Sequence, residues 1–113
     1  MQRIAVASYG DIKPGEMNEV EVLNTPILLA NVAGALYALD AQCTHGQGRL
    51  AQGVMEGYVV KCPLHGAMFD VRTGEVVKPK RNAYGMPVGG PATANLRTYR
   101  VVEEEGQVFI EIP

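Results

Sequence analysis

All the cysteines and histidines of this 113-residue chain fall within two short stretches. The first reads CTHG at residues 43–46, and the second reads CPLHG at residues 62–66. Each stretch supplies one thiol and one imidazole, in the patterns Cys-x-His and Cys-x-x-His. Two thiolates and two imidazoles are sufficient to hold a metal centre. The pattern therefore requires a fold that places two distant loops side by side, and it predicts four metal ligands: Cys43, His45, Cys62 and His65.

Length and composition indicate one soluble domain that spans residues 1–113. The chain is 47% hydrophobic and 19% charged, and its net charge of −2 gives no reason to expect binding to nucleic acid or an anionic membrane. It has no apolar run close to the roughly 20 residues that a membrane span needs, and its start does not resemble a signal peptide. We therefore expect a cytoplasmic protein. A disulfide between the two cysteines is disfavoured because each has a histidine two or three positions away.

Hydrophobic periodicity predicts an all-β chain. Val20 and Val22 alternate with Glu19 and Glu21, as in a half-buried antiparallel strand, and no segment keeps the 3.6-residue period of a helix. We expect nine or ten short strands, at 3–8, 17–23, 26–32, 35–40, 54–55, 58–61, 68–70, 75–77, 98–104 and 107–112. Tight turns are expected at Asn24-Thr25, Ala33-Gly34, Glu56-Gly57 and Glu105-Gly106.

The predicted strands place both ligand stretches in loops. The first loop, 41–53, follows a strand, and a small hairpin at 54–61 leads directly into Cys62. Asp40 and Asp70 flank the two loops and are expected to hold turns. The segment 78–95, rich in proline and glycine, is longer than most loops of compact domains, which favours a functional role.

On this frame the chain resembles the Rieske-type ferredoxins of bacterial ring-hydroxylating oxygenase systems. The resemblance rests on the two ligand stretches, supported by DIKPGE at 11–16, Phe69-Asp70 and Thr73-Gly74. It implies a Rieske iron–sulfur fold, an antiparallel β-sandwich or barrel with a small cluster-binding subdomain at about 41–77. It also implies one [2Fe–2S] cluster, with one iron held by Cys43 and Cys62 and the other by His45 and His65.

Two departures separate the chain from the respiratory Rieske proteins of cytochrome bc complexes. Those proteins carry an extra cysteine in each ligand loop, and this chain has none to spare. They also place a serine and a tyrosine after the second loop, where this chain has Ala67 and Phe69. Both departures point to the ferredoxin branch.

The resemblance implies a soluble one-electron carrier rather than an enzyme. Such a carrier passes electrons from a flavin-dependent NAD(P)H reductase to a terminal Rieske oxygenase through transient contacts. A small Rieske-like subunit of another redox enzyme, such as a nitrite reductase, is an alternative. A zinc-stabilised interaction module is a further alternative, although zinc fingers usually pair cysteine with cysteine and histidine with histidine. A catalytic oxygenase subunit is disfavoured because no histidine is left for a mononuclear iron.

Overall fold

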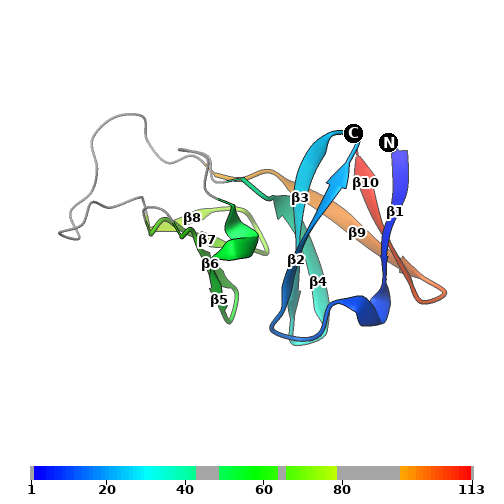
Figure 1. The fold of residues 1–113 in the computed structure, drawn as a ribbon, viewed down its shortest axis with the longest axis horizontal. Coiled ribbons are helices and arrows are strands. Elements are labelled where there is room, and N and C mark those ends of the chain that lie inside the picture. Colours follow the sequence, from blue (N-terminus) through cyan, green and yellow to red (C-terminus); the bar gives the residue numbers. More distant parts are fainter. Residues whose placement is uncertain (1, 43–48, 64–65, 79–94, 113) are drawn as a thin grey trace.

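The computed structural model describes residues 2–42, 49–63, 66–78 and 95–112, which form two antiparallel sheets (Figure 1). Within these residues the elements follow the order β1 (Gln2–Ser8), η1 (Tyr9–Asp11), β2 (Met17–Val22), β3 (Thr25–Val32), β4 (Ala35–Asp40), η2 (Leu50–Gln52), β5 (Val54–Glu56), β6 (Val59–Lys61), β7 (Met68–Asp70), β8 (Val76–Lys78), β9 (Thr98–Glu104) and β10 (Gln107–Ile112). The elements η1 and η2 are single turns of 3-10 helix. The predicted all-β class is confirmed.

The larger sheet has six strands in the order β1-β10-β9-β4-β3-β2. It joins both ends of the described chain, since Gln2 pairs with Ile112. Residues from both edge strands, Ile4 of β1 and Val22 of β2, pack on one hydrophobic cluster together with Ile110. The sheet is therefore curled around an apolar core of its own.

The smaller sheet has four strands in the order β5-β6-β7-β8 and lies beside β3 and β4 of the larger sheet (Figure 1). A second cluster fills the space between them, and it includes Leu28 and Leu39 from the larger sheet with Val60 and Phe69 from the smaller one. Burial of this apolar surface is the main interaction that holds the two sheets together.

The middle of strand β3, from Ile27 to Ala30, is entirely apolar because both of its faces are buried. Ile27 and Leu29 pack in the core of the curled sheet, whereas Leu28 and Ala30 pack in the cluster between the sheets. A strand with one face in water would alternate apolar and polar residues instead, as β2 does. The position of β3 therefore links the curled core to the sheet that carries the second ligand loop.

Two of the predicted turns are displaced by one residue. The first hairpin turns at Leu23-Asn24, because Val22 pairs with Thr25 and both turn residues have positive φ, 49° and 65°. A β-branched Thr25 is a poor candidate for that left-handed conformation and stays in the strand. The hairpin of the small sheet turns at Gly57-Tyr58, with Gly57 at φ 58°, because glycine suits the first central position of such a turn.

Candidate metal centre

The two ends of the first ligand loop, residues 41–42 and 49–50, are held together by hydrogen bonds, and we call such paired ends the base of a loop. Gln42 and Arg49 form an antiparallel bridge, and the Leu50 N–H donates to the Ala41 carbonyl at 3.0 Å. An ion pair between Arg49 and Glu19 ties the same base to β2. Cys43 and His45 belong to residues 43–48, outside the described residues. Their loop thus begins and ends at adjacent, hydrogen-bonded backbone positions.

The second ligand loop has a base of the same kind. The Cys62 N–H donates to the Ala67 carbonyl at 2.7 Å, and the Gly66 N–H donates to the Cys62 carbonyl at 3.3 Å. Gly66 has a φ of +72°, a conformation that favours glycine and helps the chain return within a few residues. His65 lies outside the described residues, so Cys62 is the one predicted ligand whose position the structure gives.

The bases of both loops belong to one buried cluster. Ala41 and Leu50 from the first base, and Cys62 and Ala67 from the second, are buried in the apolar core between the sheets. A close backbone approach joins them further, because a Cβ on Gly53 would lie 2.0 Å from the Lys61 carbonyl oxygen. Gly53 follows the first base, and Lys61 directly precedes Cys62. The fold therefore places two distant loops side by side, as the ligand pattern requires.

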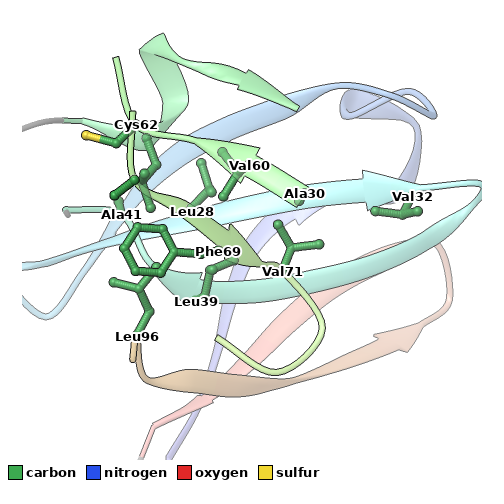
Figure 2. Close-up of a cluster of buried hydrophobic side chains, with 12 residues drawn as sticks. Leu28, Ala30, Val32, Leu39, Ala41, Val60, Cys62, Phe69, Val71 and Leu96 are labelled. Atoms are coloured by element: carbon green, nitrogen blue, oxygen red, sulfur yellow. The ribbon is translucent and has the colours of Figure 1, made fainter. Parts of the chain in front are cut away.

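The Cys62 side chain fits a metal centre at this end of the cluster. It is a free, fully buried thiol. Figure 2 shows Cys62 at the edge of the labelled cluster, with its sulfur pointing away from Val60 and Phe69. A buried cysteine is either an inert apolar group or, as a thiolate, a metal ligand. The outward direction of the sulfur and the adjacent base of the first loop agree with the second role.

Ala67 and Phe69 are both fully buried beside Cys62. The Phe69 ring lies between Ala41 and Leu96 in the close-up (Figure 2). Neither side chain has a polar hydrogen to donate. The second loop is therefore backed by apolar side chains at both positions that the sequence singled out.

The two flanking aspartates have different roles. Asp70 holds a turn, as predicted, because its carboxylate accepts hydrogen bonds from the Arg72 N–H and from the Arg72 guanidinium. The side-chain hydrogen bond from Arg72 lowers the pKa of the Asp70 carboxyl. Among the described residues, the partners of the Asp40 carboxylate lie far along the chain and not in a neighbouring turn. The carboxylate bonds to Arg97 and Tyr99, because the chain that enters β9 passes beside the end of β4.

Sequence reasoning did not single out Leu96, Arg97 and Tyr99. Leu96 is buried in the same cluster as Cys62, and the Tyr99 hydroxyl donates to Asp40 across 59 positions of sequence. Burial raises the pKa of the Tyr99 hydroxyl to about 12, and the hydrogen bond to Asp40 adds to the shift. One sequence signal could have indicated these long-range contacts. Asp40 is a single carboxylate at the end of a strand whose other residues carry no charge, so it could be expected to need a polar partner.

Comparison with known proteins identifies the family. The model of the Rieske [2Fe-2S] domain matches residues 2–100. The chain belongs to the Rieske family. The ferredoxin component of biphenyl 2,3-dioxygenase from Rhodococcus jostii is 38% identical to this Rieske protein over 107 residues, which cover 95% of this chain and 90% of the relative. The ferredoxin component of the naphthalene 1,2-dioxygenase system from Pseudomonas putida is 35% identical over 109 residues, which cover 96% and 94%.

A solved structure adds a likeness in three dimensions. It is a complex of reduced oxygenase and oxidised ferredoxin in carbazole 1,9a-dioxygenase. The matched chain is 31% identical to this Rieske protein, with a TM-score of 0.77, and the match covers 96% of this chain and 91% of that one. Within the described residues, no helix has the length and apolar character needed to cross a membrane.

Proposed function

We propose that this Rieske protein is the ferredoxin component of a multicomponent ring-hydroxylating oxygenase system. The observation that carries the proposal is similarity over nearly the whole length of ferredoxin components from two such systems. The matches cover 95–96% of this chain and 90–94% of the two relatives. An electron-carrying component, rather than a catalytic subunit, is therefore the reading that fits the whole chain.

The centre proposed for this carrier is one [2Fe–2S] cluster held by Cys43, His45, Cys62 and His65. When bound, a Rieske cluster supplies a one-electron redox centre. The thiolates of Cys43 and Cys62 would hold one iron, and the imidazoles of His45 and His65 would hold the other. The buried thiol of Cys62 and the adjacent bases of the two loops support this assignment.

In this proposal the residues around Cys62 exclude water from the metal centre and keep its surroundings rigid. Ala41, Leu50, Ala67 and Phe69 keep water away from the bases of both loops, because all are buried in one apolar cluster. A rigid, dry base limits the rearrangement that accompanies a change in charge at the centre. The chain has two histidines in all, and both are assigned here, so none is left to bind a catalytic mononuclear iron.

The proposed partners are a flavin-dependent NAD(P)H reductase, which donates the electron, and a terminal Rieske oxygenase, which accepts it. The solved complex of an oxygenase with a ferredoxin supports the second partner. We also propose a cytoplasmic location, and a single domain, residues 1–113, with residues 41–77 as its cluster-binding part. The small four-stranded sheet and the bases of both ligand loops support that division.

The experiment has two arms. The first measures iron, acid-labile sulfide and zinc in the purified protein, and the account predicts two irons and two sulfides per chain. The second replaces the ferredoxin component of the Pseudomonas putida naphthalene 1,2-dioxygenase system with this chain and follows oxidation of NAD(P)H coupled to product formation. Zinc in place of iron would contradict the proposed centre. A full cluster that neither the reductase reduces nor the oxygenase oxidises would contradict the proposed partners.

A further inference from the structure

The Asp40 carboxylate connects two segments that are far apart in sequence. Its Oδ2 accepts hydrogen bonds from the backbone N–H of Arg97 at 3.3 Å and from its Nε at 3.1 Å, and its Oδ1 accepts one from the Tyr99 hydroxyl at 2.6 Å. The backbone adds a fourth bond, because the Asp40 N–H donates to the Arg97 carbonyl at 3.0 Å. Asp40 ends β4 and lies three positions before Cys43 in the sequence.

The segment that Asp40 holds, Asn95–Arg97, is also bound to the small sheet, and we refer to it as the return segment. Its Leu96 N–H donates to the Gly74 carbonyl at 2.8 Å, and its Asn95 Oδ1 accepts from the Val76 N–H at 3.0 Å. The Leu96 side chain is buried beside Phe69 in the cluster between the sheets (Figure 2). The return segment is thus fixed to the small sheet on one side and to β4 on the other.

This double attachment bears on the two ligand loops because each loop starts from a different sheet. The first loop follows β4 of the large sheet, and the second follows β6 of the small sheet. The positions of Cys43 and Cys62 relative to each other therefore depend on how the sheets are held together. We propose that Asp40 is a positioning residue for the metal centre, because it clamps the return segment and so fixes the spacing of the two ligand loops. This inference rests on the proposed [2Fe–2S] centre.

The clamp is more than a surface ion pair. The Arg97 side chain is 75% exposed, and such pairs contribute little by themselves. The Asp40 side chain is only 20% exposed, however, and it receives a backbone N–H and a partly buried hydroxyl as well as the guanidinium. Loss of several hydrogen bonds to one partly buried carboxylate costs more free energy than loss of the exposed ion pair alone.

Asp70 provides a closely matched control. It also ends a strand, its side chain is 19% exposed, and it also accepts a backbone N–H and two guanidinium N–H groups from one arginine. Its partner, Arg72, is two positions away in the same turn, so this network joins no separate segments. Asp40→Asn and Asp70→Asn therefore remove the same charge and several hydrogen bonds each, and they differ in whether the bonds reach a distant segment that is itself bonded to the small sheet.

The experiment measures two quantities in the cluster-loaded protein. Hydrogen exchange by mass spectrometry follows the peptide that contains Leu96, and loss of visible absorption in excess chelator gives the rate of cluster release. In Asp40→Asn we expect both rates to rise by about fivefold or more, because several hydrogen bonds to one partly buried carboxylate are lost and local opening becomes easier. In Asp70→Asn we expect changes below about twofold. Tyr99→Phe, which removes one hydroxyl, should raise both rates by a smaller factor.

A charge effect is separated from a positioning effect by Arg97→Gln. If Asp40 acted only through its charge, Asp40→Asn and Arg97→Gln would shift the reduction potential in opposite directions and leave cluster release unchanged. If Asp40 positions the loops, Asp40→Asn releases the cluster faster, whereas Arg97→Gln, which removes only the exposed pair, changes the release rate by less than about twofold. The first result would overturn the inference, and the second supports it.

The remaining outcomes also decide the matter. Equal acceleration in Asp40→Asn and Asp70→Asn would reduce the effect to general stability and overturn the inference. So would faster exchange at Leu96 without faster cluster release, because the clamp would then not reach the ligand loops. A wild-type protein that assembles no iron–sulfur cluster would contradict the proposed centre itself, whereas the other results contradict only the role of Asp40.

Discussion

Gly74, in the turn between β7 and β8, lies against the backbone of the return segment, and Gly74→Ala tests that contact. A Cβ built on Gly74 would lie 2.1 Å from the Leu96 carbonyl oxygen, well inside the distance at which atoms repel. Gly74 also has a φ of +76°, a conformation that costs an L-residue roughly 1–2 kcal/mol. Relief of the clash must displace Leu96, with a strain of about 1–3 kcal/mol and the loss of a hydrogen bond worth about 1 kcal/mol.

Gly106→Ala is the matched control for this prediction. Gly106 has a φ of +78°, and its carbonyl also accepts a backbone hydrogen bond of 2.8 Å from a distant residue, Tyr9. A Cβ on Gly106 would nevertheless meet no atom within 4 Å. The two variants share the backbone cost and the smaller entropy of the unfolded chain, so the difference between them isolates the clash.

Urea denaturation of both variants measures that difference. We expect Gly74→Ala to lower the free energy of unfolding by about 2–4 kcal/mol more than Gly106→Ala, with unchanged m-values. Equal destabilisation of the two variants would refute the reasoning, because it would mean that the return segment yields to the new methyl group without cost. The description of that segment as a fixed link between the sheets would then be wrong.

Three further predictions concern the proposed centre and its surroundings. Cys62→Ser should abolish the visible absorption and the bound iron, because a thiolate ligand is lost, and a full cluster spectrum in this variant would show that the ligand assignment is wrong. Ala67→Ser and Phe69→Tyr should each raise the reduction potential measured by protein-film voltammetry, because a hydroxyl donor stabilises the more negative reduced cluster. A weak charge-assisted hydrogen bond of about 1.5 kcal/mol corresponds to about 65 mV for one electron, and we expect each shift to be no larger than that. No upward shift in either variant would sink this argument. Tyr99 should ionise near pH 12 rather than near its ordinary pKa of 10.0, because burial disfavours the phenolate. The stability that the neutral hydroxyl contributes is therefore present below pH 10 and is lost as the pH rises toward 12. A phenolate absorbance step near pH 12 that is absent from Tyr99→Phe would agree with this, and identical titrations of the two proteins would contradict it.

The sequence predicted the strands well because their alternation is local. The last hairpin, β9 and β10, has the predicted bounds, and β4 and β7 also begin and end at the predicted residues. Each pattern reflects the burial of one strand face, which a few neighbouring residues decide. The two displaced turns were less predictable, because conformational strain at single residues such as Leu23 decided them, not hydrophobicity.

Strand order and long-range contacts could not be predicted from local patterns. Nothing in the alternation of β1 indicates that it pairs with β10, and nothing in β4 indicates that Asp40 meets Tyr99. These contacts depend on how the sheet curls and on where the chain returns after the long segment. The ligand residues, in contrast, were recognisable because rare residue types were concentrated at a characteristic spacing, although the structure describes only Cys62 among them.

The central claim is that two cysteines and two histidines of this chain hold one [2Fe–2S] cluster. The most direct measurement is the electron paramagnetic resonance spectrum of the dithionite-reduced protein, recorded with a determination of iron and sulfide. Mixed cysteine and histidine ligation should give a rhombic signal whose average g-value lies below that of an all-cysteine [2Fe–2S] cluster. His45→Cys and His65→Cys should alter that signal. A spectrum of the all-cysteine type, or reduced protein with no signal and bound zinc, would contradict the account.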